Sequence, residues 1–158
     1  MKILVIGGTQ FVGRAMAEVA LAKGHELTLF NRGRTGADLF PHAEKLVGDR
    51  DGGLDVLDGR QWDAVIDTCG YVPRLVKDSA TKLKDAVQTY CFVSTISVYG
   101  DTSQTGIVET SPINREMEDP TSEEITGETY GPLKALCEDE VTAAFPTNHL
   151  IIRPGLVT

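Results

Sequence analysis

The sequence has no apolar run close to the roughly 18 residues that suggest a membrane-spanning helix. It also lacks the basic segment followed by an apolar core that opens a secretory signal, since one lysine precedes a short predicted strand. We therefore expect a cytoplasmic protein without a membrane partner.

Cysteine is scarce. Only Cys69, Cys91 and Cys137 are present among 158 residues, and none belongs to a CxxC pair. Their odd number and wide separation favour neither a disulfide framework nor a zinc site. We expect buried free thiols in a reducing compartment, and no bound metal.

Basic residues are outnumbered, with 15 Lys and Arg against 23 Asp and Glu and a net charge of −8. Proteins that bind nucleic acid usually carry a basic patch or a positive balance. Arg14, Arg32 and Arg34 are close enough in sequence to form a local patch, but the overall balance argues against a nucleic-acid partner.

The most informative stretch runs from Gly7 to Gly13. A short apolar strand, residues 2–6, ends there, and a helix with apolar residues at steps of three and four begins at Phe11. The N-terminus of such a helix favours a phosphate at the turn. The candidate phosphate-binding residues are Gly7, Thr9, Gln10, Phe11, Val12 and Gly13.

Two complete nucleotide motifs are nevertheless missing. Gln10 stands where the dinucleotide fingerprint has its middle glycine, and Arg14-Ala15 stands where a P-loop needs Lys followed by Ser or Thr. Taken alone, the stretch is therefore also compatible with a glycine-rich turn that binds nothing.

Strands and helices alternate along the chain, which predicts a doubly wound parallel sheet in three α/β/α layers, a Rossmann fold with strand order 3-2-1-4-5-6. The length fits one domain, residues 1–158. The predicted strands are residues 2–6, 26–30, 44–47, 63–67 and 89–95, the predicted helices are 11–22, 73–85 and 130–144, and 54–57 is a helical turn.

Polar clusters follow the predicted strands, at the sheet edge where ligands bind in such folds. At the end of the second strand, where an adenine ribose would lie, Asn31 replaces the carboxylate that favours NAD, and Arg32 and Arg34 follow it. A guanidinium matches a 2′-phosphate, so we favour NADP over NAD. The alternative is that both arginines are solvated loop charges.

Tyr130 and Lys134 begin the last predicted helix. At positions i and i+4 they share one helix face, so that an ammonium lies near a phenol and makes it a usable acid or base. The pair follows a strand end that offers the hydroxyls of Ser94, Thr95 and Ser97. Between the two lies an irregular region, residues 100–128, which composition alone assigns equally well to an active-site edge or to a mobile segment.

Several motifs together resemble the extended short-chain dehydrogenase/reductase superfamily, above all its NAD-dependent epimerase/dehydratase group, which includes isoflavone-reductase-like proteins. The resemblance spans essentially the whole chain. The motifs are Gly7–Gly13, Asp67-Thr68-Cys69-Gly70, Ser94–Gly100, Tyr130–Lys134 and Ile152-Arg153-Pro154-Gly155.

The resemblance implies a catalytic set and an NAD(P) site. Tyr130 would be the acid/base, Lys134 would hold the ribose and lower the pKa of the tyrosine, and Thr95 would hydrogen-bond the substrate oxygen. Asp49 and Arg50 would lie near the adenine. The other implied cofactor residues are Thr68, Cys69, Gly70, Pro154 and Gly155.

By the same resemblance, the enzyme would transfer a hydride to or from a small molecule, such as a sugar nucleotide or another hydroxyl or carbonyl compound, and a homodimer is compatible. Family members continue past residue 158, so we expect an N-terminal portion without the C-terminal substrate domain. This portion by itself is a candidate for an inactive fragment. The alternative is a non-catalytic nucleotide-sensing or RNA-binding protein, because the turn also resembles chloroplast stem-loop-binding relatives.

Overall fold

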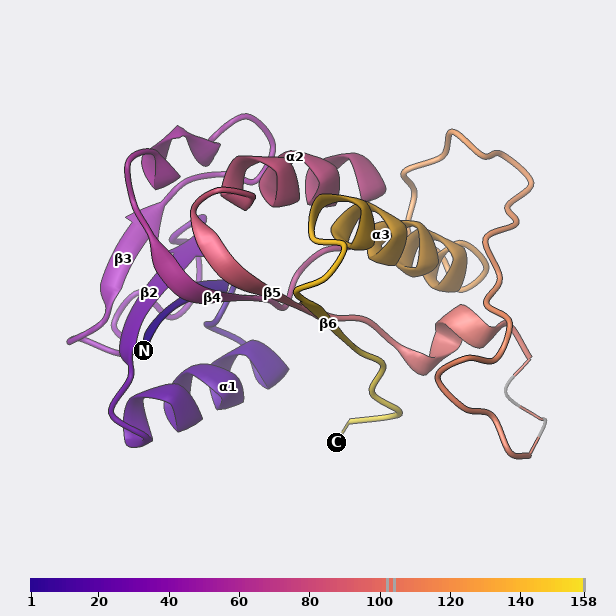
Figure 1. Ribbon diagram of the computed structural model, residues 1–158, viewed down its shortest axis with the longest axis horizontal. Coiled ribbons are helices and arrows are strands. Elements are labelled where there is room, and N and C mark those ends of the chain that lie inside the picture. The colour runs from indigo at the N-terminus through magenta and orange to yellow at the C-terminus, as the bar shows by residue number, and fades with distance from the viewer. Residues whose placement is uncertain (102, 104, 158) are drawn as a thin grey trace.

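The apolar runs of the sequence form one parallel sheet, which crosses the middle of the molecule in Figure 1. The computed structural model describes residues 1–101, 103 and 105–157. The predicted strand order is confirmed, since the sheet runs β3-β2-β1-β4-β5-β6. The strands are β1 Lys2–Ile6, β2 Glu26–Asn31, β3 Glu44–Val47, β4 Trp62–Asp67, β5 Val87–Val93 and β6 His149–Ile152.

Helices cover both faces of the sheet. In Figure 1, α2 (Pro73–Leu83) and α3 (Tyr130–Ala144) lie together on one face, and α1 (Phe11–Ala22) lies on the other. The strand order reverses between β1 and β4, and right-handed crossovers then place helices on opposite faces. Two 3₁₀ turns, η1 (Leu54–Leu57) and η2 (Ile96–Tyr99), complete the set. None of the described helices is long and apolar enough to cross a bilayer.

β1 is buried on both faces, as its continuous apolar sequence predicted. Ile3 and Val5 pack in the cluster beneath α1, whereas Leu4 and Ile6 belong to the larger core beneath α2 and α3. Because side chains alternate along a strand, one run of four apolar residues serves both cores.

The strand and helix ends differ from the predicted ones in a few places. β5 ends at Val93 rather than at residue 95, because the Thr95 hydroxyl accepts a hydrogen bond from the backbone N–H of Ser97 (3.2 Å) and begins η2. α2 ends at Leu83, whose carbonyl accepts from Ala86. The sixth strand, β6, has four residues at one edge of the sheet.

The three cysteines are free thiols. Burial raises the pKa of Cys91 to about 11 and that of Cys137 to about 12, so both stay protonated at neutral pH. Their position in the interior agrees with the sequence prediction.

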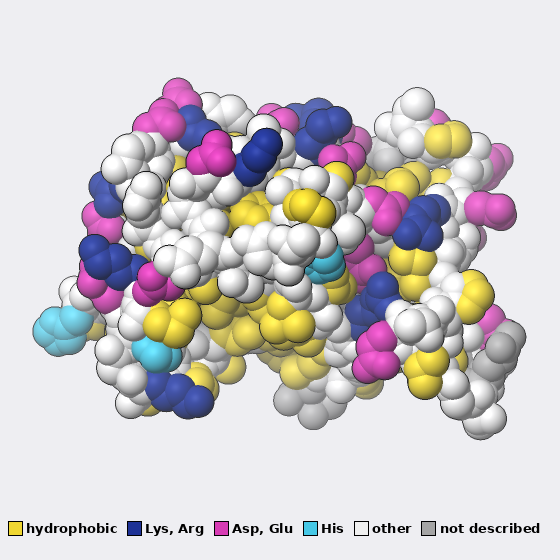
Figure 2. Space-filling view, viewed as in Figure 1, with side chains coloured by type: hydrophobic (Ala, Val, Ile, Leu, Met, Phe, Trp, Pro, Cys, Tyr) yellow, Lys and Arg dark blue, Asp and Glu magenta, His cyan; other side chains and the backbone are white. Residues whose placement is uncertain are grey.

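The face of the sheet that carries α1 is only partly covered. An apolar groove of about 640 Å³ lies there, lined by residues from α1, β1, β4 and β6, among them Ile3, Met16, Ile66 and Ile152. Figure 2 shows hydrophobic side chains gathered between the positions of α1 and β6.

Gly13 provides a test of the contact between α1 and the sheet. A Cβ atom there would lie 2.7 Å from the Thr68 hydroxyl and 3.0 Å from the Gly8 nitrogen. We expect Gly13→Ala to lower the free energy of unfolding, measured in urea, by about 1–3 kcal/mol. This is opposite in sign to the gain of about 0.5–1 kcal/mol that alanine brings inside a helix.

Gly127→Ala is the control, because a Cβ atom at Gly127 would have no other atom within 4 Å. Equal stability of the two variants would show that Gly13 is not required for close packing.

Candidate functional site

A cleft of about 850 Å³ lies at the carboxyl ends of the strands. This is within the range of about 300–1,000 Å³ that is usual for ligand sites. It brings together all the predicted site residues except Gly70, which lies outside the lining. Those in the lining are Gly7, Thr9, Gln10, Phe11, Val12, Gly13, Asn31, Arg32, Arg34, Asp49, Arg50, Thr68, Cys69, Thr95, Tyr130, Lys134, Pro154 and Gly155.

The turn between β1 and α1 forms a close cradle. Gly7 has φ +99°, and a Cβ atom there would lie 2.6 Å from the Thr68 hydroxyl, so only glycine fits. That hydroxyl donates to the Ile6 carbonyl (2.9 Å). Gln10, at the N-cap of α1, makes no side-chain capping bond, and the first helical turn holds no acid. The helix N-terminus is therefore suited to an anion.

Asn31 at the end of β2 holds the cradle rather than pointing freely at the cleft. Its side-chain amide donates to the Gly7 carbonyl (3.1 Å) and accepts from the backbone N–H of Gly33 (2.9 Å). Arg32 and Arg34 are exposed beside it, and neither guanidinium makes an ion pair within the described part of the chain. Two unpaired cations thus border the cleft at the predicted ribose position.

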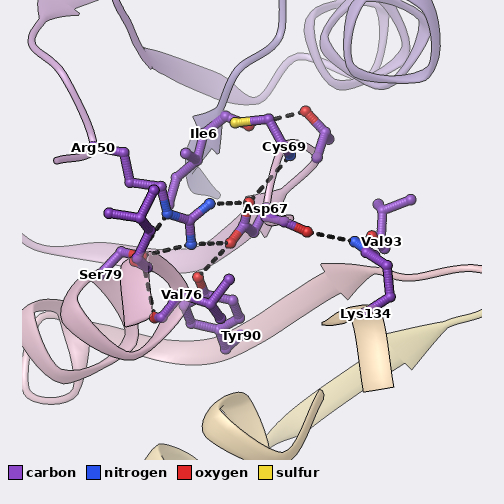
Figure 3. Close-up of polar contacts among 12 residues, drawn as sticks. Ile6, Arg50, Asp67, Cys69, Val76, Ser79, Tyr90, Val93 and Lys134 are labelled. Atoms are coloured by element: carbon purple, nitrogen blue, oxygen red, sulfur yellow. Dashed lines mark hydrogen bonds and ion pairs between the residues drawn. The ribbon is translucent and has the colours of Figure 1, made fainter. Parts of the chain in front are cut away.

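Arg50 is engaged beneath the cleft, as Figure 3 shows. Its guanidinium donates to both carboxylate oxygens of Asp67 (2.9 and 2.6 Å), to the Ser79 hydroxyl (2.6 Å) and to the Leu75 carbonyl (3.0 Å). Four of its five N–H donors are engaged in these bonds, and the nearness of Arg50 to an adenine, which the resemblance implies, stays a prediction. Asp49, its neighbour, remains exposed in the lining.

Asp67 is fully buried and has further donors. Its carboxylate accepts from the Tyr90 hydroxyl (2.8 Å) and the backbone N–H of Cys69 (3.2 Å). Burial alone would raise the pKa of this carboxyl, but Arg50 and Tyr90 hold it below its usual value. Asp67 is thus a buried anion that fixes the turn Thr68–Gly70.

Lys134 is buried at the inner wall of the cleft. Its ammonium donates to the carbonyls of Gly70 and Val93, both at 2.7 Å, and lies 4.0 Å from the ring centroid of Phe92. Burial lowers its pKa to about 8, and the opposite charge of Asp67 limits the shift. Two of its three N–H donors are used in these bonds, which leaves one.

Tyr130 and Thr95 line the same cleft from two elements. Tyr130 is the first residue of α3 and is partly buried, whereas Thr95 precedes η2 and is 8% exposed. The Thr95 hydroxyl donates to that of Ser97 (3.2 Å), which is exposed. The cleft therefore holds a phenol, an ammonium and two hydroxyls, a set able to move a proton to or from a substrate oxygen.

The sequence analysis missed Tyr71, which also lines the cleft. Its ring lies 6.4 Å from that of Tyr130, centroid to centroid, and the Lys134 ammonium lies 5.4 Å from its centroid. Its position directly after Gly70, at a predicted strand end, was the available signal.

Residues 100–129 are anchored to the rest of the molecule by arginines. Arg153 pairs with Glu138 of α3 (2.7 Å) and donates to the Tyr99 hydroxyl and the Glu109 carbonyl, both at 2.9 Å. Two further pairs are Arg115 with Asp139 (2.6 Å) and Arg74 with Glu123 (2.9 Å). These contacts tie the region to α2 and α3, while none of its described residues lines the cleft.

Comparison with known proteins identifies the family. A model of the NAD-dependent epimerase/dehydratase family matches residues 3–153. The chain belongs to the NAD-dependent epimerase/dehydratase family. Its motifs therefore occur in the order that the resemblance implied.

Solved structures confirm the fold of this epimerase/dehydratase family member. A UDP-galactose 4-epimerase matches with TM-score 0.74 and 23% identity, over 97% of this chain and 55% of that one. The enzyme WbmH of Bordetella bronchiseptica, solved with NAD⁺, matches with TM-score 0.75 and 18% identity, over 96% and 55%. The chain thus spans about half the length of these structures.

Curated relatives match over shorter segments. A chloroplast stem-loop binding protein of 41 kDa from Arabidopsis thaliana is 40% identical over 50 residues, which are 32% of this chain and 12% of that protein. A bifunctional pinoresinol-lariciresinol reductase from Forsythia intermedia is 42% identical over 38 residues, 24% of this chain and 12% of the reductase.

The pairing of Arg50 with Asp67 makes a prediction for stability. Asp67→Asn leaves the guanidinium buried without its countercharge, and we expect a loss of about 3–5 kcal/mol in the free energy of unfolding. The contribution of the carboxylate is present above its unfolded pKa of about 3.9 and is lost as the pH falls through its lower folded pKa.

Glu26→Gln removes an exposed pair with Lys2, at 3.9 Å, and is the control that should change little. Urea unfolding at pH 7 compares the two variants. Similar losses in both would mean that the buried pair of Arg50 and Asp67 contributes no more to the free energy of unfolding than the exposed pair.

Proposed function

We propose that this chain is the cofactor-binding portion of an NAD(P)-dependent epimerase, dehydratase or reductase of the extended short-chain dehydrogenase type. The observation that supports this most directly is that Tyr130, Lys134 and Thr95 line the same cleft as the glycine turn Gly7–Gly13. The substrate would be a small molecule with a hydroxyl or carbonyl group.

The residues of the cleft fit a nicotinamide dinucleotide. A Cβ atom at Gly7 or Gly13 would strike Thr68, so the tight turn needs glycine, and the α1 N-terminus borders the cleft without an acid in its first turn. A bound nicotinamide supplies a carbon that accepts and returns a hydride. The chain's own part is to bind, to orient and to move a proton.

In this proposal Tyr130 passes the proton to or from the substrate oxygen, and Thr95 hydrogen-bonds that oxygen. Lys134 lies one turn along α3 from Tyr130 and lines the same cleft. Its remaining N–H is available to a ribose hydroxyl, since Gly70 and Val93 accept the other two.

The preference for NADP is supported by the two unpaired guanidinium groups beside Asn31. Arg32 and Arg34 are exposed in the cleft lining, and the position that would favour NAD with a carboxylate holds an amide already bonded to Gly7 and Gly33. NAD is the alternative, because solved structures with the same fold contain it.

A second candidate is RNA binding on the same scaffold. The 40% identity over 50 residues with the chloroplast stem-loop binding protein favours it, whereas the net charge of −8 does not. Calorimetric titration with NADPH, NADH and an RNA stem-loop in turn separates the two candidates. Heat from the RNA alone would support the second one.

Tyr130→Phe tests the catalytic proposal. We expect loss of turnover in the complete natural protein, because the phenylalanine ring has no proton to transfer, whereas calorimetric affinity for NADPH should stay nearly unchanged. Undiminished turnover would remove Tyr130 from the mechanism.

Arg32→Ala tests the cofactor preference. A charged hydrogen bond to phosphate is worth about 1.5–3 kcal/mol, so NADPH affinity should fall by roughly tenfold or more, with little change for NADH. Arg60→Ala is the control, because this arginine lies outside the cleft lining and pairs with Glu44. Equal losses for both cofactors would contradict the proposed 2′-phosphate contact.

A further inference from the structure

Tyr71 occupies a position in the cleft that no part of the proposed mechanism uses. It directly follows Gly70 and is 42% exposed. Its ring plane makes an angle of 37° with that of Tyr130, at a centroid distance of 6.4 Å. The Lys134 ammonium lies 5.4 Å from its ring centroid. One aromatic ring thus contacts both members of the Tyr-Lys pair.

The surroundings of Lys134 form a cage with four members. Two are backbone carbonyls, of Gly70 and Val93, and two are aromatic rings, of Phe92 and Tyr71. The Phe92 ring is fully buried, whereas Tyr71 is exposed and lines the cleft. Tyr71 is therefore the one aromatic member of the cage that is exposed to the cleft.

The ring rather than the hydroxyl of Tyr71 makes these contacts. Within the described residues the hydroxyl has no hydrogen-bond partner, and burial together with the nearby Tyr130 raises the pKa of this phenol, which stays neutral at physiological pH. An ammonium is attracted to an aromatic face without any contribution from a hydroxyl group. Phenylalanine should therefore replace Tyr71 in this role, and an aliphatic residue should not.

We propose that Tyr71 is a positioning residue, whose ring covers part of the cleft side of the Lys134 cage and braces Tyr130. It keeps the ammonium and the phenol in one arrangement and screens the ammonium from bulk water. The statement about the cage is independent of catalysis, whereas the consequence for turnover rests on the proposed function.

Competitive labelling with acetic anhydride measures how accessible each lysine is. In the complete natural protein we expect Tyr71→Leu to speed the labelling of Lys134 by about tenfold, because the aliphatic side chain opens the cage, and Tyr71→Phe to leave the rate within about twofold of the original. The exposed Lys77 serves as internal reference for reagent activity, and far-UV circular dichroism shows whether each variant is folded.

Two results would overturn the proposal: equal labelling of Lys134 in the original and the Tyr71→Leu protein, or equal acceleration by Tyr71→Leu and Tyr71→Phe. If circular dichroism shows that Tyr71→Leu does not fold, Tyr71→Met replaces it as a flexible non-aromatic variant with the same expected result.

Turnover is a second readout, and it distinguishes a positioning role from a purely structural one. Tyr71→Leu should lower kcat with little change in NADPH affinity, and Tyr71→Phe should restore kcat. Acceleration of Lys134 labelling together with absence of any turnover in the original protein would keep the cage and refute the proposed function. Failure of the labelling result refutes the cage, whatever the activity.

Discussion

The buried pair of Arg50 and Asp67 is the contact on which both ends of the cleft depend. Through Asp67 it fixes the turn that follows β4, and through Leu75 and Ser79 it holds that turn to α2. Two contacts of that turn serve the two ends of the cleft. Thr68 packs against the glycine cradle, and the Gly70 carbonyl receives the Lys134 ammonium. Cofactor end and catalytic end therefore share one anchor.

Of the two buried cations near this anchor, Arg50 is bonded to the Asp67 carboxylate and Lys134 is not. Asp67 is one buried anion facing two buried cations, and its carboxylate oxygens are bonded to Arg50 and Tyr90. Lys134 is left with neutral carbonyls and aromatic rings, which is why burial can lower its pKa to about 8. The described residues place no carboxylate in direct contact with this ammonium, so its positive charge is not neutralised by a bonded partner.

Much of this could be predicted from the sequence, and the exceptions have physical causes. Apolar runs and helical spacing located β1, β3 and α3, and strand ends located the cleft. The resemblance places Arg50 near the adenine, but neither it nor the spacing reveals that this side chain pairs with the buried Asp67, 17 residues along the chain. Tyr71 was missed for a related reason, since its role depends on rings brought together only by folding. The predicted order includes a sixth strand for which no residue range is predicted, and β6 occupies four residues at the sheet edge.

Arginine side chains hold the segment of residues 100–129 to the rest of the molecule outside the core. The hydroxyl of Thr95 and the phenol of Tyr130 lie on opposite ends of this segment, which has no helix or strand in its described part. Backbone hydrogen bonds of regular structure therefore cannot fix one relative to the other. Arg153 supplies the connection, because it joins Tyr99, at the end of η2, to Glu138, two turns along α3 from Tyr130. A single guanidinium directly after β6 thus links the element that carries the hydroxyls to the helix that carries the acid/base pair.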